Sequence, residues 1–178
     1  MAIVQRNTAQ WQALDASHHI HPFCDPKSLA ERGVRVITSA DGCYVTDSDN
    51  NRILDGMAGL WCVNVGYGRQ ELVDVATQQM EQLPFNNSFF QSSTPSQIEL
   101  AQKLSEVAPG NLNHFFFANS GSEANDTVIR MARHYWHVRG KPKKYAFIGR
   151  NLGYHGSTLA ATSLGGMKHM HDMGSSTL

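Results

Sequence analysis

The stretch FFFANSGSEANDTVIRMARHYW, residues 115–136, decides the fold of this chain. Three phenylalanines lead directly into a segment of small polar residues, 119–123, and an amphipathic pattern begins there. A short run that is apolar on both sides is typical of a strand covered on both faces. The apolar residues that follow recur at steps of four and three, which predicts a helix from about 121 to 139. These positions are Ala124, Val128, Met131, Tyr135 and Val138.

A second pattern of the same kind follows. Residues 144–149 predict another buried strand, residues 151–157 form a loop of small residues, and a further helix is expected from about Thr158. Strand, helix, strand and helix in this order indicate a βαβ unit in a parallel sheet. Because parallel strands end at one edge, we expect the loops after Phe117 and Ile148 to lie together where open α/β sheets bind ligands.

The upstream half has a different organisation. Residues 1–17 predict a polar helical arm, and residues 18–23 an irregular entry segment interrupted by Pro22. Residues 34–55 contain three short β runs separated by turn-forming residues, which predicts an antiparallel meander. Two further helices are expected, one over about 69–83 and one from Pro95 to about Val107.

Composition excludes several classes of protein. The 178 residues carry 15 Lys+Arg and 15 Asp+Glu without a basic block, which argues against a nucleic-acid or anionic-membrane binder. No apolar run is long enough to cross a bilayer, and the first residues lack the features of a secretory signal, so we expect a cytoplasmic protein. The three cysteines, Cys24, Cys43 and Cys62, form no CxxC pair and are expected to be reduced structural thiols.

No metal site is predicted. Asp47, Asp49 and Asn51 alternate as in a calcium loop, but Arg52 stands where an EF-hand needs glycine. The histidines at 18, 19, 21, 169 and 171 are expected to be solvated or part of the entry loop. Gly66-Tyr67-Gly68 lacks the third glycine of a dinucleotide-binding turn.

The two loops of the βαβ unit point to a phosphorylated ligand. Ser120, Gly121 and Ser122 stand at a predicted helix N-terminus, where free N–H groups and the helix dipole favour an anion. Helix capping by either serine is an equally good interpretation of this loop alone. Tyr154 on the second loop could stack on a flat ring held by the phosphate. Taken together, the loops suggest a planar phosphorylated cofactor such as pyridoxal phosphate.

Three stretches carry a family resemblance. They are DGCYVTDSDNNRILDGMAGLWCVNVGYG, FFFANSGSEANDTVIRMAR and GRNLGYHGSTLAATS. In this order and spacing the chain resembles the class III aminotransferases of the pyridoxal-phosphate-dependent fold type I superfamily, and within them the ω-amino-acid or amine:pyruvate type. The resemblance implies an α/β fold with a small antiparallel β segment and the start of a mainly parallel, helix-covered sheet. It also implies two parts: an arm and small-domain meander over 1–68, and an incomplete cofactor-binding domain over 69–178.

The resemblance also implies site residues and partners. Ser120, Gly121 and Ser122 would bind the cofactor phosphate, Tyr154 would stack on the ring, and His155 and Gly156 would complete that loop. Trp61 would form a wall of the substrate pocket, Phe89 would reach into the pocket of the partner subunit, and Phe23 would lie near the entrance. Without the resemblance, core packing is the favoured interpretation of Trp61 and Phe89. The substrates would be an amine or ω-amino acid and a keto acid, and the enzyme would be a homodimer or tetramer.

One departure from the family pattern concerns the catalytic lysine. Transamination needs a lysine that binds the cofactor and moves a proton, and none stands at a matching position. The lysines present are Lys27, Lys103, Lys141, Lys143, Lys144 and Lys168. We therefore expect an N-terminal portion of a longer enzyme that is inactive alone. The alternatives are another class III activity, of the aminomutase or decarboxylase type, and a non-catalytic phosphate-binding or interaction fragment.

Overall fold

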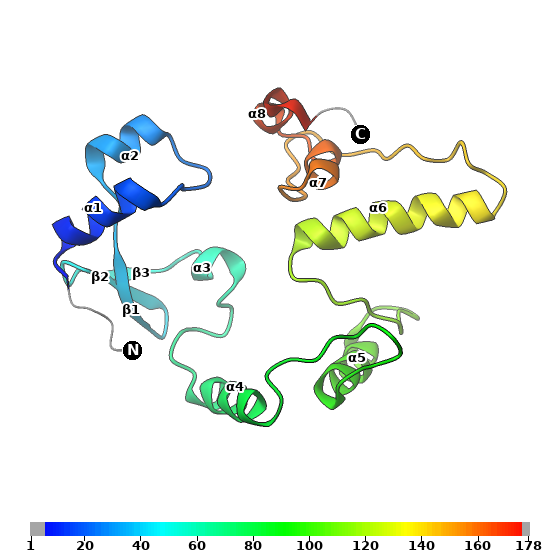
Figure 1. Cartoon of the computed structure of the whole chain (residues 1–178), viewed down its shortest axis with the longest axis horizontal. Coiled ribbons are helices and arrows are strands. Elements are labelled where there is room, and N and C mark those ends of the chain that lie inside the picture. The colour runs from blue at the N-terminus through cyan, green and yellow to red at the C-terminus, as the bar shows by residue number, and fades with distance from the viewer. Residues whose placement is uncertain (1–5, 176–178) are drawn as a thin grey trace. The chain divides into compact units, whose positions relative to one another are not determined.

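A computed structural model describes residues 6–175, in two compact units that comprise residues 1–87 and 88–178 (Figure 1). The first five residues of the expected arm and the last three of the chain lie outside the described part. None of the described helices is both long enough and apolar enough to cross a membrane.

The first unit contains the predicted antiparallel meander. Strands β1 (Ile37–Asp41), β2 (Tyr44–Asp47) and β3 (Arg52–Leu54) form a sheet in the order β1-β2-β3. Tyr44 lies opposite both Asp41 on β1 and Leu54 on β3. The Arg52 guanidinium lies over the Tyr44 ring, 3.5 Å from its centroid, and adds a cation–π contact across the β2–β3 pair. Residues 42–43 form the turn between β1 and β2.

The turn between β2 and β3 is closed by a buried carboxylate. Asp47 Oδ1 accepts hydrogen bonds from the backbone N–H groups of Asp49, at 3.0 Å, and Asn51, at 2.9 Å. The Asn51 side-chain amide also donates to this carboxylate, and these bonds lower the pKa of Asp47 below its usual value. The alternating acidic residues therefore build a turn, as expected once a calcium loop was excluded.

Four helices belong to the same unit: α1 (Thr8–His18), α2 (Pro26–Arg32), α3 (Ala58–Trp61) and α4 (Gln70–Gln82). A capping box formed by Asn7 and Gln10 begins α1. Gln12 on α1 donates to the Val34 carbonyl at 2.9 Å, and Thr8 contacts Ser48 at 2.8 Å, which connects α1 to the two segments that flank the β1–β2 hairpin at its open end. Helices α1 and α4 confirm the predicted helical arm and the helix expected at 69–83.

The second unit contains α5 (Pro95–Val107), α6 (Gly121–Val138), α7 (Leu159–Leu164), α8 (Lys168–Met170) and a π-helical turn, η1 (His171–Ser175). Helix α6 packs on α7, and α7 packs on η1. The bounds of α5 and α6 agree with the predicted helices. Helix α7 begins one residue after the predicted start.

The two strands predicted in this unit are not formed. Residues 114–118 and 144–149 are drawn as coil in Figure 1 and join no β-ladder among the described residues. A strand needs the backbone of a neighbouring strand, whereas the apolar pattern reports only the tendency to be covered. The side chains are not covered either, because Phe116 is 70% and Ile148 98% exposed. The expected coverage on both faces is therefore wrong for this chain alone.

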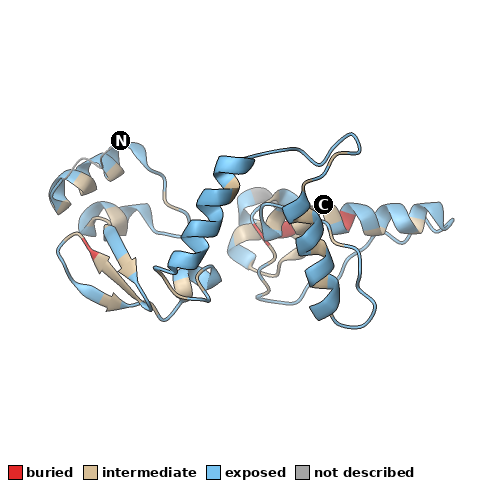
Figure 2. Ribbon diagram, turned by 90° about the horizontal axis from the view of Figure 1, so that it is seen from below, coloured by how far each residue is buried: buried red, intermediate tan, exposed pale blue. Residues whose placement is uncertain are grey.

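Burial is concentrated where α6 meets α7 (Figure 2). Ile129 of α6 and Ala161 of α7 are the buried apolar residues among those described, with Thr162 and Gly156 buried beside them. The accessible surface is 14961 Å², against about 10,000 Å² expected for two separate compact units of half this mass each. Large apolar surfaces are thus uncovered, including Leu72 and Met80 on α4.

Candidate functional site

The two loops identified in the sequence lie against each other. The Ser157 N–H donates to Ser122 Oγ at 3.0 Å, and the Asn125 side-chain amide donates to the His155 carbonyl at 2.6 Å. Ser122 and Asn125 belong to the first two turns of α6, whereas 155 and 157 belong to the loop before α7. The predicted proximity of the loops is therefore present, although the segments that precede them are not strands.

Asp126 links the same two elements from one turn further along α6. Its Oδ1 accepts a hydrogen bond from Thr158 Oγ1 at 2.7 Å and from the Ala161 N–H at 3.1 Å. Both donors belong to the beginning of α7, where backbone N–H groups lack partners within the helix. A side chain of α6 therefore caps α7, because the N-cap residue Thr158 makes no side-chain capping bond of its own.

Gly156 makes this contact possible because it has no side chain. Its φ of 132° is a conformation that residues with a Cβ rarely adopt. A Cβ at this position would lie 2.5 Å from Ser122 Oγ and 2.8 Å from both Ser122 Cα and Ala161 Cβ. The loop can therefore approach the start of α6 only with glycine at 156.

The N-terminus of α6 is capped and still offers donors. Ser120 Oγ accepts from the Glu123 N–H at 3.2 Å, and Glu123 Oε2 accepts from the Asn119 N–H at 3.0 Å. This arrangement is the capping interpretation of the loop. The backbone N–H groups of Gly121 and Ser122 make no hydrogen bond among those described, and a Cβ on Gly121 would meet nothing within 4 Å. Capping and anion binding therefore use different groups of the loop.

This donor set fits a phosphate group. Two adjacent helix N-terminal N–H groups and the Ser122 hydroxyl, which can donate its own proton while accepting from Ser157, are suited to phosphate oxygens. Tyr154 and His155 stand beside Gly156 on the facing loop, and Tyr154 is 54% exposed. The residues thus fit the phosphate and ring of pyridoxal phosphate, while their roles as its ligands stay a prediction.

The second unit also contains a cavity that lies apart from the two loops. Its volume is about 940 Å³, and it is lined by residues 116–119, one side of α6, residues 145–147 and α7. Ser122, Tyr154, His155 and Gly156 are not among its lining residues. This cavity is the space between α6 and the two unpaired apolar segments, and it is not the predicted cofactor site.

The three predicted substrate-pocket residues come from different segments of the chain. Phe23 follows α1, Trp61 ends α3, and Phe89 belongs to the other unit. Their exposed fractions are 72%, 73% and 72%, so core packing is not their role within this chain.

Trp61 stands at the end of a left-handed turn. All four residues of α3, Ala58–Trp61, have φ between 47° and 65°. A left-handed conformation costs about 1–2 kcal/mol for each residue other than glycine, so three such residues store about 3–6 kcal/mol. Strain of this kind persists only where surrounding contacts enforce it, and it is common at functional sites.

Asp55 provides those contacts. Its Oδ2 accepts from the Gly59 N–H and from the Tyr67 hydroxyl, both at 2.7 Å, and its Oδ1 accepts from the Met57 N–H at 3.2 Å. The bond from Tyr67 is the main cause that lowers the pKa of Asp55, and the same bond raises the pKa of Tyr67. Tyr67 is itself held by two backbone bonds to Gly42, at 2.8 and 3.2 Å.

Replacing Asp55 by asparagine is expected to release this turn. The amide keeps one acceptor oxygen but presents N–H groups where the other carboxylate oxygen accepted, so the strained turn loses at least one of its three hydrogen bonds. In a variant with Trp61 as its single tryptophan, we expect altered Trp61 emission and several-fold faster proteolysis within 56–66. Asp74→Asn is the matched control, since Asp74 on α4 accepts only from Gln70 among its described hydrogen bonds.

Low pH should release the turn at Ala58–Trp61 in the unmutated chain, as Asp55→Asn is expected to do. The pKa of Asp55 is lowered in the folded state. The stability that Asp55 gives to the turn is therefore complete above the ordinary pKa of aspartate and is lost as pH falls through the lower folded value. A pH titration of Trp61 emission should therefore be flat above about pH 5 and change below about pH 4. An identical titration in Asp55→Asn would contradict this assignment.

Sequence reasoning missed four residues that build these sites: Asp55, Tyr67, Asn125 and Asp126. Their signals were weak. An acidic residue such as Asp126 near the start of a helix is expected to complement the dipole of its own helix, and Tyr67 stands between two glycines that suggest only a turn. The bond between Asp55 and Tyr67 and the bonds from Asn125 and Asp126 to the facing loop span 12 to 35 positions, which periodicity over a short window cannot detect.

None of the described lysine contacts reaches the two loops. Lys103 pairs with Glu106 and Lys168 with Asp172, each within its own segment. Lys141 and Lys144 lie over the Trp136 ring, at 5.6 and 3.7 Å from its centroid. Each of these four lysines therefore contacts only groups outside the two loops.

Comparison with known proteins identifies the family. Residues 28–178 match the model of the family described as aminotransferase class-III. The putrescine–pyruvate aminotransferase of Pseudomonas aeruginosa is 59% identical over 172 residues, which are 97% of this chain and 38% of that protein. The β-alanine–pyruvate aminotransferase of the same organism is 39% identical, over 86% of this chain and 34% of its own length. The chain thus spans just over a third of these relatives.

A solved structure shows the same fold. The omega-transaminase of Pseudomonas jessenii in complex with PMP matches with a TM-score of 0.91 and 39% identity, over 94% of this chain and 37% of that one. The predicted fold class is thereby confirmed, and the cofactor of this family is pyridoxal phosphate, of which PMP is the amine form. By the extent of the family match and the fold, this chain belongs to the class III aminotransferases.

Proposed function

We propose that this chain is the N-terminal portion of a cytoplasmic, homodimeric or tetrameric enzyme that moves an amino group from an amine or ω-amino acid to pyruvate or a similar keto acid. The observation that carries the proposal is the joined pair of loops at the start of α6, whose donors fit the phosphate of the family's cofactor. The domain boundary near residue 68, between the meander and the cofactor-binding part, is included in the proposal.

The loop at the start of α6 holds the phosphate in this proposal. Gly121 and Ser122 donate their N–H groups, the Ser122 hydroxyl adds a third donor, and Ser120 keeps the loop in place by capping α6. The dipole of an 18-residue helix adds to the attraction for the dianion. These contacts orient the cofactor and take no part in proton transfer.

The facing loop covers the ring. Tyr154 stacks on the pyridine face, and His155 and Gly156 hold the loop against α6 through the Asn125 bond and the close contact with Ser122. Bound pyridoxal phosphate supplies an electron sink for the bond changes at the substrate amine carbon. The described part of this chain contributes binding, orientation and exclusion of water from one face of the ring.

Phe23, Trp61 and Phe89 are assigned to the substrate pocket. A thermostable omega-transaminase engineered for bulky amines carries substitutions at a tryptophan and at a phenylalanine 28 positions further on. Trp61 and Phe89 are also 28 positions apart. Exposed aromatic rings at these positions give apolar walls for the carbon chain of an amine.

A diamine is the favoured donor. The relative that is 59% identical over 97% of this chain is named for putrescine and pyruvate, whereas the β-alanine relative is 39% identical. A short diamine has an apolar middle and a second ammonium group, so aromatic walls can contact the first and attract the second.

The test uses the full-length enzyme loaded with pyridoxal phosphate. With putrescine and pyruvate it should form alanine, with a higher kcat/KM for putrescine than for β-alanine. Absence of alanine formation from either donor would refute the transaminase assignment. Turnover of β-alanine alone would refute only the choice of donor.

The 178-residue chain provides the complementary measurement. Borohydride reduction in the presence of pyridoxal phosphate, followed by mass spectrometry, should yield no stoichiometric lysine adduct. A single modified lysine at full occupancy would show that this chain carries its own catalytic lysine. Calorimetry of phosphate-ligand binding, compared with Ser122→Ala, separates a working phosphate site from a vestigial one.

A further inference from the structure

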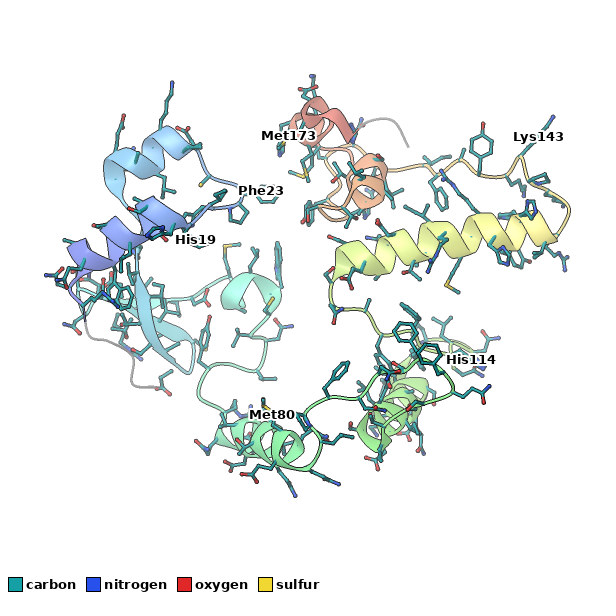
Figure 3. All side chains as sticks on the ribbon, viewed as in Figure 1. His19, Phe23, Met80, His114, Lys143 and Met173 are labelled. Atoms are coloured by element: carbon teal, nitrogen blue, oxygen red, sulfur yellow. The ribbon has the colours of Figure 1, made fainter. Side chains whose placement is uncertain are left out.

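Three potential metal ligands meet at the end of α1, outside the proposed cofactor site. His19 Nδ1 lies 3.0 Å from Asp15 Oδ1, and His21 Nε2 lies 2.8 Å from Asp15 Oδ2. Figure 3 shows His19 at the end of α1, before the loop that carries Phe23. One ligand atom from each of the three residues lies within 4.8 Å of the others. Sequence reasoning treated these histidines as solvated, because Asp15 was not recognised as their common partner.

The local backbone brings the three residues together. Asp15 and His19 are four positions apart, so they lie on one face of the last turn of α1. His19 ends the helix and donates its backbone N–H to the Asp15 carbonyl at 2.9 Å. The chain then turns so that the His19 and His21 rings lie 4.1 Å apart, centre to centre. Asp15 and His21 are partly buried, with side chains 18% and 23% exposed.

The geometry points to a binding site for a divalent transition metal, Zn²⁺ in the first instance, formed by Asp15, His19 and His21. Tetrahedral zinc at about 2.0–2.1 Å from nitrogen and oxygen ligands sets neighbouring ligand atoms about 3.3 Å apart. Asp15 Oδ1 lies 3.0 Å from both His19 Nδ1 and His21 Nε2, so these two separations need to widen by only a few tenths of an ångström. Two imidazoles and one carboxylate are ligands that zinc commonly uses.

Binding requires a change of tautomer in the two rings together with these small movements of the ligand atoms. Without metal, the neutral histidines donate to Asp15 through His19 Nδ1–H and His21 Nε2–H. With metal, these nitrogens offer lone pairs, and each ring carries its proton on the other nitrogen, exchanged through water. No net proton is released by either ring, and no oxidant or other reactant is needed.

The surroundings leave room to complete the coordination. The cluster lies on a cavity of about 620 Å³ that is also lined by Gln12, Cys24 and part of α2. Water completes the four-coordinate shell in this proposal. Two imidazole ligands exclude Mg²⁺ and Ca²⁺, which prefer oxygen, and make these ions suitable negative controls. A bound ion would fix the segment that carries Phe23 to α1, and this inference does not depend on the proposed function.

The test is calorimetry of the untagged 178-residue chain with Zn²⁺, together with Co²⁺ absorption spectra. We expect one Zn²⁺ per chain, no heat with Mg²⁺ or Ca²⁺, and visible Co²⁺ bands typical of nitrogen and oxygen ligands. Asp15→Asn and His21→Gln should each weaken Zn²⁺ binding by at least about tenfold. His18→Gln is the matched control, since His18 is exposed and lies outside the cluster.

Two outcomes would overturn the proposal. Equal loss in His18→Gln and His21→Gln would indicate binding to surface histidines in general. A sulfur-to-cobalt charge-transfer band that persists in Asp15→Asn and His21→Gln would place the ion on an exposed cysteine instead, of which the chain has three. Circular dichroism of each variant without metal shows whether α1 is retained, and His19 and His21 NMR shifts on addition of Zn²⁺ report the site directly.

Discussion

The substitution Gly156→Ala is expected to separate the loop before α7 from the start of α6. The added Cβ would meet Ser122 Oγ, Ser122 Cα and Ala161 Cβ at 2.5–2.8 Å, and φ of 132° is strained for alanine. Backbone strain costs about 1–3 kcal/mol and overpacking about 1–3 kcal/mol, so the docked state loses about 2–6 kcal/mol. That is a large fraction of the stability of a typical domain.

Hydrogen exchange provides the measurement for Gly156→Ala. The Ala161 N–H is bonded to Asp126, and its residue is fully buried, so its protection reports the docked state. Gly121→Ala is the matched control for folding, because a Cβ there meets nothing within 4 Å and alanine favours the helix. Unchanged Ala161 protection in Gly156→Ala would mean that the loops are not docked in solution.

Local patterns were sufficient to predict the helices. The stripe on residues 121–139 and the proline before residue 96 define α6 and α5 within one residue of the structure. The meander followed from its turn formers, and Asp47 closes the second turn as expected of aspartate. Each of these features depends on contacts between residues that are near in sequence, which periodicity and turn chemistry report well.

The predicted strands failed because their determinants are not local. Residues 114–118 and 144–149 have the apolar pattern of buried strands, yet a strand forms only against a neighbouring backbone. The relatives are more than twice as long as this chain, and Phe116 and Ile148 remain exposed here. The apolar pattern of these two segments therefore indicates that they need neighbouring strands, which the described residues do not supply.

The sequence predicted where the candidate site lies, but not which side chains hold its two loops together. Adjacent loops at the start of α6 followed from the βαβ pattern, and the structure joins Ser122 to Ser157. The bonds made by Asn125 and Asp126 to residues 30 and 35 positions away had no sequence signal. The same holds for the carboxylate of Asp55, which supports the left-handed turn before Trp61.

Removing the Asp126 carboxylate should have the second large effect. In Asp126→Ala, Thr158 Oγ1 and the Ala161 N–H lose their acceptor at the partly buried start of α7. Loss of hydrogen bonds to a charged acceptor costs about 2–3 kcal/mol, and unfolding by urea should show this decrease in stability. A short helix of six residues has little stability of its own, so α7 should lose its amide protection as well.

The substitution Asp126→Asn distinguishes the contribution of hydrogen-bond acceptance from that of the negative charge. The amide keeps one oxygen that can accept from Thr158 and Ala161, so most of the stability should be retained if hydrogen bonding dominates. Equal destabilisation by alanine and asparagine would mean that the charge is what stabilises α7, through its helix dipole. No destabilisation by alanine would contradict the contact itself. Because Asp126 lies one turn beyond Ser122, loss of this cap should also weaken phosphate binding at the start of α6, although Asp126 is not itself a donor to the phosphate.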